Sequence, residues 1–202
     1  MHNNSMLDLP EEYKTLEETL HASFKVLEDA IENRHNLFHT PVLSTFSDSK
    51  INSRVIVLRA FDPESRTFRI HSDSRSRKIK DILQNADATL LGYDPGLKIQ
   101  LKLHGSIETH HQDNIADLAW RDSQEMSKVC YSVSESPGKE IDDPGKYDVD
   151  SENINLSEGY KNFAVINFHF NSLEFLYLRS SGHRRSIHVW ETEELRSNWM
   201  VP

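Results

Sequence analysis

From residue 41 to residue 109, short runs of apolar, β-branched and aromatic residues alternate with polar turns. This pattern limits the possible folds strongly, because such runs between turns are typical of strands. The turns have the sequences Ser-Asp-Ser-Lys, Asp-Pro-Glu-Ser and Asp-Pro-Gly. The predicted strands span residues 41–47, 54–61, 67–72, 88–93, 97–109, 163–170, 173–178 and 187–190. They predict a mainly β fold, an antiparallel barrel with flanking helices on its outside.

Residues 10–33 have the pattern of an amphipathic helix. Apolar residues at steps of three and four form one stripe, made of Tyr13, Leu16, Leu20, Phe24, Leu27 and Ile31. Asp8 and Glu11 have the spacing of a capping pair at its start. We expect residues 1–34 to form an N-terminal helix that packs on a barrel domain of residues 35–202.

Two shorter helices and one polar stretch interrupt the predicted strands. The helices are expected at residues 75–85 and 113–124. Residues 132–159 are rich in Ser, Glu, Asp, Pro and Gly and have almost no apolar residues. We expect this stretch to be a mobile excursion on the surface of the barrel domain.

The charge balance of the chain limits its partners. Its 202 residues include 32 Asp and Glu against 23 Lys and Arg, a formal net charge of −9. Proteins that bind nucleic acid or anionic membranes normally carry a broad basic face, and the sequence has none, so neither partner is expected. A local basic cluster in an acidic chain indicates a small anionic ligand instead.

The sequence also indicates a compartment. Cys130 is the only cysteine, so no intrachain disulfide can form, which fits a reducing environment. No apolar run approaches membrane-spanning length, and the N-terminus lacks a hydrophobic signal region. We therefore expect a cytoplasmic protein, with a nuclear presence left open.

A basic cluster lies between residues 54 and 78. One predicted strand begins at Arg54, and another ends at Ser72 before a Ser-rich loop and the first helical turn with Arg77 and Lys78. Cationic and hydroxyl donors beside a helix N-terminus are suited to bind a phosphate dianion. The alternative is a solvated helix face beside a strand-edge arginine. The anion site is favoured because Ser72, Ser74 and Ser76 crowd the loop where the helix begins, and because Arg54 begins a strand with a buried pattern.

Other candidate sites have weaker patterns. The histidines, including His110 and His111, lack the spacing of a metal site, and no metal is expected. Cys130 is a conceivable nucleophile, but a lone cysteine beside a polar loop is more often incidental. The chain has no Gly-rich dinucleotide fingerprint, Walker-type loop or nucleophile elbow.

Several short motifs occur in a fixed order along the chain. They are Arg54-Val-Ile-Val-Leu-Arg59, Ser72 through Ser76-Arg77-Lys78, Gln100 ahead of Gly105, Arg121-Asp122-Ser123-Gln124, the basic segment around Arg184 and the terminal Trp-Met-Val-Pro. In this order they resemble the pyridoxamine 5′-phosphate oxidase family, whose fold is an FMN-binding split barrel. The resemblance covers residues 35–202 and is closer to the oxidase-related branch than to the authentic oxidases.

The resemblance implies a homodimer with FMN at the subunit interface and a small-molecule substrate. It implies cofactor-binding roles for Arg54, Val55, Ile56, Val57, Leu58, His71, Ser72, Arg77, Lys78, Gln100 and His188. The cations would pair with the FMN phosphate, and Gln100 would reach the flavin of the partner subunit. Substrate-binding roles are implied for Arg59, Ser123 and Arg184, and the catalytic residues stay unassigned.

This chain also departs from the family at several positions. Arg59 stands where the authentic oxidases have a lysine, Ala119 where an arginine contacts the substrate phosphate, and Ile115 where a tyrosine does. Ser186 replaces a substrate-contacting histidine, and His188 replaces an FMN-contacting arginine. Losing an arginine–phosphate contact should weaken binding of a phosphorylated vitamin severely. The flavin half of the site is thus better retained than the substrate half.

These observations favour an FMN-binding oxidoreductase with an altered substrate. One alternative is an authentic pyridoxamine/pyridoxine 5′-phosphate oxidase that makes pyridoxal 5′-phosphate. Others are a non-catalytic flavin-binding protein, a barrel that binds another planar ligand such as haem, and a structural dimer with an empty site. The last is least favoured, because its cations would crowd together without a partner.

Overall fold

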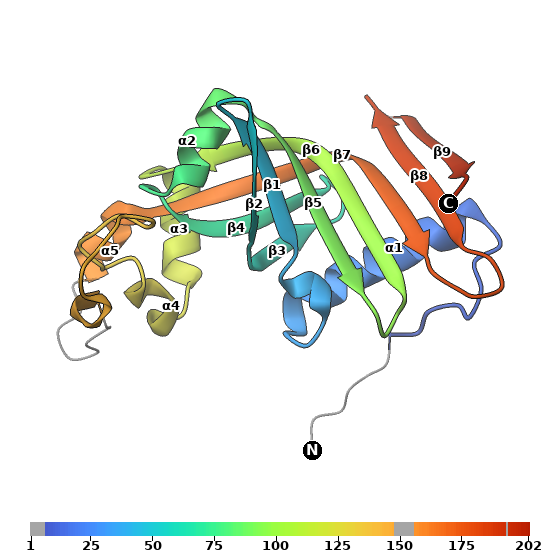
Figure 1. Ribbon diagram of the computed structural model, residues 1–202, viewed down its shortest axis with the longest axis horizontal. Coiled ribbons are helices and arrows are strands. Elements are labelled where there is room, and N and C mark those ends of the chain that lie inside the picture. Colours follow the sequence, from blue (N-terminus) through green and yellow to red (C-terminus); the bar gives the residue numbers. More distant parts are fainter. Residues whose placement is uncertain (1–6, 148–155, 193) are drawn as a thin grey trace, which may run out of the picture.

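The computed structural model describes residues 7–147, 156–192 and 194–202, in which one antiparallel sheet runs through the molecule (Figure 1). Neighbouring strands follow the order β2-β1-β5-β6-β7-β4-β3, and β8 and β9 extend the sheet from β7. The strands are β1 Val42–Ser47, β2 Lys50–Val55, β3 Leu58–Asp62, β4 Thr67–Asp73, β5 Asp87–Asp94, β6 Ile99–His110, β7 Phe163–Tyr177, β8 Arg184–Glu191 and β9 Glu194–Met200. The prediction of a mainly β fold with flanking helices is confirmed.

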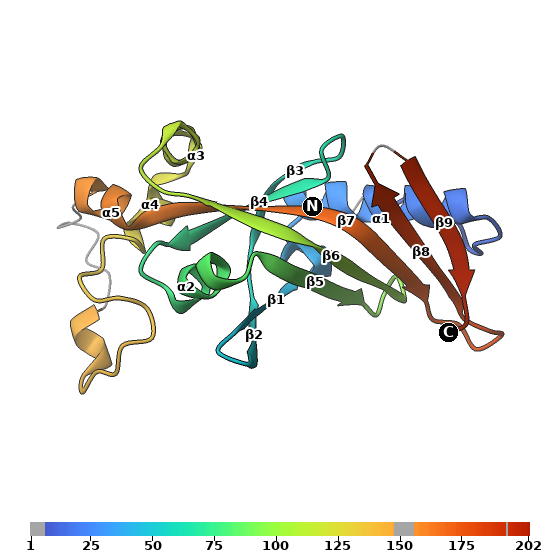
Figure 2. The same ribbon diagram turned by 90° about the horizontal axis from the view of Figure 1, so that it is seen from above.

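Helices pack on different parts of this sheet. Helix α1 contacts β3, β7, β8 and β9, whereas α2 contacts β1 and β6. Seen from above, α2 and α3 lie on opposite sides of β7 (Figure 2). The helices are α1 Leu16–Glu32, α2 Arg77–Gln84, α3 Asn114–Asp122, α4 Glu125–Val129 and α5 Leu156–Asn162, with short 3₁₀ helices η1 Leu37–His39 and η2 Pro144–Tyr147.

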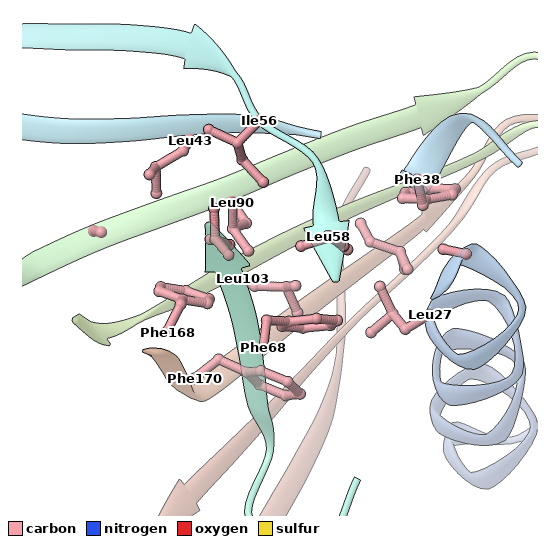
Figure 3. Packing of buried hydrophobic residues seen from close by; sticks show 14 of the residues in the cluster. Leu27, Phe38, Leu43, Ile56, Leu58, Phe68, Leu90, Leu103, Phe168 and Phe170 are labelled. Carbon is pink, nitrogen blue, oxygen red and sulfur yellow. The ribbon is translucent and has the colours of Figure 1, made fainter. Parts of the chain in front are cut away.

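The main hydrophobic core lies between α1 and the strands. Leu27 of α1 belongs to the same buried cluster as Leu58, Phe68 and Phe170 (Figure 3). The rings of Phe61 and Phe68 stack with their centroids 4.3 Å apart. Each fully buried apolar side chain contributes about 1.5–3 kcal/mol, so this cluster holds α1 firmly on the sheet. A second cluster under α3 consists of Ala119, Phe163 and Val165, with Trp120 and Tyr131 packed against it.

Helix α1 begins later than the sequence pattern predicts. The first helical residue is Leu16, and Thr15 is the N-cap. The Thr15 hydroxyl accepts from the amide of Glu18, and the Glu18 carboxylate accepts from the amide of Thr15, which forms a capping box. The predicted pair of Asp8 and Glu11 is therefore wrong, because the complete capping box lies seven residues further along the chain.

Strand β2 begins earlier than predicted because a two-residue turn joins it to β1. Asp48 and Ser49 have φ values of 51° and 61°, the left-handed values that a tight hairpin turn requires. The strand therefore starts at Lys50 and pairs with β1 along its whole length.

The predicted single strand over residues 54–61 is divided in the structure. Strand β2 ends at Val55, and β3 starts at Leu58. The amide of Ile56 still donates to the carbonyl oxygen of Pro41 (3.0 Å), the next pair in the register of β2 with β1, but Pro41 has no amide hydrogen to donate in return, and the pairing ends there. This break lets the chain leave β1 and pair with β4 at the other edge of the sheet.

The C-terminal strands differ from the prediction in two ways. The two strands expected over residues 163–170 and 173–178 form the single strand β7, and its bend is taken up by a bulge opposite His104 and Gly105. A Cβ on Gly105 would lie 2.0 Å from the carbonyl oxygen of His169, so only glycine fits there. Strand β8 is longer than predicted, and β9, which the sequence analysis did not predict, pairs with it.

The polar stretch over residues 132–159 contains η2 and the start of α5. Residues 148–155 lie outside the described residues. Arg75 donates to the carbonyl oxygens of Val133 and Ser134 (both 2.9 Å), which fixes the start of the stretch to the turn before α2. Among the helices that the structure describes, none is long and apolar enough to cross a membrane.

Candidate cofactor and substrate sites

Three polar side chains converge where β4 leads into α2. The Nζ of Lys78, in the first turn of α2, donates to the Oγ of Ser72 (3.0 Å) and to the Oγ of Ser76 (3.3 Å). Both serines are buried, and their hydroxyl oxygens lie 3.2 Å apart. Ser76 is the N-cap of α2, but its side chain makes no capping hydrogen bond. The amide of Ile79 donates to the carbonyl oxygen of Ser76 (3.1 Å), whereas the amides of Arg77 and Lys78 lack a side-chain acceptor from the cap.

The ammonium group of Lys78 is partly buried and not neutralised. No carboxylate lies within 4.0 Å of its Nζ in the part of the chain that the structure describes. Burial lowers the pKa of Lys78, the charge of Arg54 lowers it further, and Asp73 opposes both. Asp73 itself forms an ion pair with Arg75 (2.7 Å). A bound anion would raise the pKa of Lys78 again, because an opposite charge nearby favours the protonated amine.

Arg54 is held by the buried carboxylate of Asp81 in α2. The guanidinium donates to Asp81 Oδ2 (3.2 Å) and to Thr45 Oγ1 (2.7 Å). Asp81 also accepts from Ser47 (2.6 Å), Thr45 (3.1 Å) and Asn52 (3.2 Å). Burial alone would raise the pKa of Asp81, but hydrogen bonds from Ser47 and Thr45 and the charge of Arg54 lower it overall. Asp81 therefore stays ionised and fixes the guanidinium of Arg54.

Arg77 lies further out than the sequence analysis expected. Its guanidinium, with the side chain 64% exposed, lies 3.6 Å from Asp48 and 3.7 Å from Asp81. The expectation of cations crowded without a partner is therefore wrong for Arg54 and Arg77, because Asp81 lies between them. Lys78, in contrast, has no carboxylate within 4.0 Å of its Nζ among the described residues.

The segment over residues 55–58 borders this group. Its alternate side chains point in different directions: Val55 is exposed, whereas Ile56 and Leu58 are buried in the main core. The buried pair anchors the segment, so its backbone has a fixed position beside Arg54.

A second group of predicted residues lines a pocket on the other side of β4. Arg59 of β3, His71 of β4 and Ser123, which ends α3, share a cavity of about 220 Å³. The helix predicted over residues 113–124 is α3, which ends at Asp122, so Ser123 lies between α3 and α4. The complete lining is Arg34, Arg59, Arg69, His71, Ala119, Asp122, Ser123, Gln124 and Ser127.

His71 has an unusual environment in this pocket. Burial lowers the pKa of His71 to about 3, and the charges of Arg69 and Arg59 contribute. Its ring packs edge-on against Phe163, with the centroids 4.9 Å apart. Its buried Nε2 has no hydrogen-bond partner among the described residues. His71 is therefore a neutral ring whose buried Nε2 has no partner among the described residues.

The structure does not bring the remaining predicted residues to either group within one chain. Gln100 lies on β6 opposite Tyr93 and Leu176. Arg184 donates to the carbonyl oxygens of Gly182 and His183 and lines a separate pocket near the C-terminus.

His188 is completely buried between β8, β9 and α1. Its Nε2 lies 3.1 Å from the hydroxyl of Thr19, and its Nδ1 lies 2.8 Å from the hydroxyl of Ser197. Burial lowers its pKa to about 4. With both ring nitrogens engaged and no exposed surface, this placement counts against the predicted contact of His188 with the cofactor.

Comparison with known proteins gives a family match for the N-terminal part of the chain. Residues 21–111 match the family model described as pyridoxamine 5′-phosphate oxidase, FMN-binding domain. These residues belong to that FMN-binding domain family. The matched segment includes Arg54, Ser72, Lys78 and Gln100, whereas Ser123, Arg184 and His188 lie beyond it. No curated protein sequence matches the chain significantly.

Solved structures show the same fold over nearly the whole chain. A pyridoxamine 5′-phosphate oxidase-related, FMN-binding protein from Nostoc punctiforme has a TM-score of 0.74 at 18% identity and covers 90% of this chain and 96% of its own. PhzG from Burkholderia lata, in complex with tetrahydrophenazine-1-carboxylic acid, has a TM-score of 0.74 at 17% identity and covers 96% and 99%. The fold is the split barrel of these oxidase-like proteins, as the sequence predicts.

Three residues of the FMN-binding domain were missed by the sequence analysis. Asp81 could have been found from its i,i+4 spacing to Arg77 on one helix. Arg69 precedes His71 by two residues on a strand and therefore faces the same side. Arg34 follows the end of α1, and no sequence signal places it beside β4.

Proposed function

We propose that the protein is a cytoplasmic FMN-dependent oxidoreductase of the pyridoxamine 5′-phosphate oxidase type. The FMN phosphate would be held at the start of α2 by Lys78, the hydroxyls of Ser72 and Ser76 and the first-turn amides. Arg54 would add a second positive charge from β2. Bound FMN would accept a hydride from the substrate and pass the electrons to an acceptor.

The observation that supports this proposal most directly is the state of Lys78. A protonated amine that is partly buried, hydrogen-bonded only to hydroxyls and without a carboxylate among the described residues needs an anion. A phosphate at the N-terminus of α2 would supply that charge and accept from the free amides. The residues present therefore fit the phosphate of FMN.

The ring of FMN has proposed contacts of a different kind. The anchored backbone of residues 55–58 would line it, together with His71 at the end of β4. Gln100 would contact it from the partner subunit, as the resemblance to the oxidase family implies. Arg77, with a largely exposed guanidinium, would contribute long-range charge to the phosphate.

The same proposal includes a homodimer formed through one face of the sheet. In the register of β1 with β2 and β5, Val42 pairs with both Val55 and Leu91, so these three side chains lie on one face of the sheet. Leu43 and Leu90 lie on the opposite face, which packs in the core. Apolar side chains that remain exposed on this face are Phe46, Ile51, Val55, Leu91 and Tyr93. An apolar sheet face of this kind is suited to bind a second copy, because burying it from water is favourable.

The first prediction tests the phosphate site. Lys78→Ala removes the unpaired ammonium, and Lys80→Ala removes an exposed lysine from the same helix. We expect purified protein to be yellow, and Lys78→Ala to weaken FMN binding roughly tenfold to a hundredfold, the effect of losing one charge-assisted hydrogen bond. FMN affinity is measured by quenching of flavin fluorescence during titration of the FMN-free protein.

Lys80→Ala should bind FMN as the unchanged protein does. Two results would contradict the proposal: a colourless protein that cannot be reconstituted with FMN, or equal FMN affinities of the two lysine variants.

A further inference from the structure

Arg75 lies in the turn between β4 and α2 and is bound on two sides. Its Nε and Nη2 donate to the two carboxylate oxygens of Asp73 (3.0 and 2.7 Å), and its own amide donates to the same carboxylate (2.8 Å). Its Nη1 and Nη2 also donate to the carbonyl oxygens of Ser134 and Val133 (both 2.9 Å). The planar guanidinium thus binds Asp73 in the bidentate geometry that arginine provides and lysine does not.

The carboxylate of Asp73 lies close to the proposed phosphate site. Asp73 follows Ser72 directly, and its carbonyl oxygen accepts from the hydroxyl of Ser72 (3.2 Å) and from the amide of Ser76 (3.1 Å). The residue is buried, so solvent screens its charge poorly. The charge of Asp73 acts on Lys78, where it opposes the lowering of the pKa by burial and by Arg54. The same charge would repel an anion bound to Lys78 unless the carboxylate is neutralised.

Arg75 supplies this neutralising charge. Its Nη2 forms the ion pair with Asp73 (2.7 Å), much as Arg54 pairs with Asp81 on the other side of the site (3.2 Å). Both carboxylates therefore have a cationic partner other than Lys78. Among the described residues no carboxylate lies within 4.0 Å of the Nζ of Lys78. The ammonium group is thus left for an anion from outside the chain.

We infer that Arg75 is a positioning residue of the phosphate site: it holds and neutralises Asp73, and thereby leaves Lys78 available to an external phosphate. Arg75 acts through Asp73 and makes no contact with the anion. The inference rests on the proposed function in one respect, that the anion is the phosphate of FMN. The arrangement of charges is a property of the folded chain and does not depend on that identity.

A purely structural role of Arg75 is the alternative. The same guanidinium fixes residues 133 and 134 to the turn, so its loss also frees the start of the polar stretch. If only these hydrogen bonds mattered, a second substitution that removes the carboxylate of Asp73 would leave the phosphate site as weak or weaker. If the charge matters, the second substitution restores the site, because no unpaired carboxylate remains to repel the phosphate. The two roles therefore predict opposite effects in a double variant.

The test is a double-mutant cycle on FMN binding. The variants are Arg75→Gln, Asp73→Asn and the two combined, and the matched control is Arg196→Gln, whose guanidinium is exposed on β9 beside Glu191. Arg75→Lys, alone and combined with Asp73→Asn, carries the same comparison if Arg75→Gln does not fold. Quenching of flavin fluorescence gives the affinity for FMN and, in parallel, for riboflavin, which lacks the phosphate. Thermal unfolding followed by circular dichroism reports the stability of each variant.

We expect Arg75→Gln to weaken FMN binding roughly tenfold or more, because the unpaired carboxylate of Asp73 then repels the phosphate. Arg75→Lys should lose less, since lysine keeps the charge but not the bidentate geometry. Asp73→Asn and the double variant should bind FMN within about threefold of the unchanged protein, even if both unfold at a lower temperature. The affinity for riboflavin should change by less than about twofold in every variant, because riboflavin carries no phosphate.

Three results would overturn the inference: equal FMN affinities of Arg75→Gln and Arg196→Gln, a double variant that binds FMN no better than Arg75→Gln, or equal losses of affinity for FMN and riboflavin. If the unchanged protein binds no FMN, the proposed function fails, and the same cycle is measured with inorganic phosphate by isothermal calorimetry. Recovery of phosphate binding in the double variant would then still support the role of Arg75. Absence of phosphate binding to the unchanged protein, or of recovery in the double variant, would overturn it.

Discussion

The carboxylate of Asp81, on α2, links this helix to both β1 and β2. It accepts hydrogen bonds from Ser47, Thr45 and Asn52 and pairs with Arg54. Without this carboxylate, the buried hydroxyls lose a charged acceptor and Arg54 loses its counter-ion. Asp81 therefore determines where Arg54 lies in relation to α2, although it is not itself a donor to any anion.

We predict that Asp81→Asn destabilises the protein by roughly 2–4 kcal/mol, because it leaves the partly buried guanidinium of Arg54 without its counter-ion and puts an NH2 donor where one carboxylate oxygen accepted hydrogen bonds. Urea unfolding followed by circular dichroism measures this difference. Because the pKa of Asp81 is lowered from its usual 3.8, its contribution is present above that pH and is lost as the pH falls through the lower folded-state value.

Asp48→Asn provides the control, because this carboxylate is 65% exposed and also lies beside Arg77. It should change stability by less than about 0.5 kcal/mol. Equal effects of the two substitutions would show that the Asp81 cluster has no special role.

Residues with a local signal were found from the sequence, and residues that depend on tertiary packing were not. Ser72 and Lys78 were grouped correctly because a strand end and a helix start follow each other in the chain. Asp81 was overlooked because a lone carboxylate within a helix normally faces solvent. Arg34 lies 25 residues before Arg59 in the chain. Only the packing of α1 on the barrel brings the two together.

At the scale of elements, His188 connects α1 to the hairpin of β8 and β9. Thr19 contributes from α1, Ser197 from β9 and Ser186 from β8 itself. The burial of the ring lowers the pKa of His188 from 6.5 to about 4. In the unfolded chain the ring is protonated below pH 6.5, whereas in the folded protein it stays neutral to about pH 4, so acid favours unfolding in this interval.

We predict that the free energy of unfolding falls by about 2 kcal/mol more between pH 7.5 and pH 5 in the unchanged protein than in His188→Gln. Urea unfolding at several pH values measures both profiles. His71 also has a lowered pKa, but its contribution to the pH dependence is the same in both proteins and cancels in the difference. Parallel profiles of the two proteins would contradict the prediction.

The elements that the sequence predicted best have one apolar face and a clear turn at each end. The prediction of two strands over residues 163–178 was wrong because Asn171 and Ser172 are residues typical of turns, although both lie within β7. The sequence prediction also failed for β9, where side chains on both faces are mostly exposed and no alternation marks a strand. The start of α1 was misplaced because the apolar stripe continues through Tyr13 into the segment before the helix. Tyr13 is buried although it is not helical.

At the scale of the whole molecule, the exposed sheet face of β1, β2 and β5 makes the proposed dimer testable. We predict that Leu91→Asp converts a dimer into a monomer, because a buried unpaired carboxylate in an apolar interface is unfavourable. Light scattering coupled to size-exclusion chromatography gives the mass. The same experiment should show loss of bound FMN, if the flavin lies between the subunits.

Leu118→Asp is the matched control, since Leu118 is 57% exposed on α3, away from that face. It should leave the mass unchanged. A monomeric unchanged protein, or equal masses for the two variants, would exclude a dimer through this face.

Strand β7 pairs with β4 near its start, with β8 near its end and with β6 along its length. The number of residues between its β4-paired part and its β8-paired part therefore determines which face each later side chain lies on. Inserting or deleting one residue near its middle would turn every later side chain to the opposite face, exposing Phe175 and burying polar neighbours. Changes in chain length during evolution would be confined to loops, or would come in pairs within this strand.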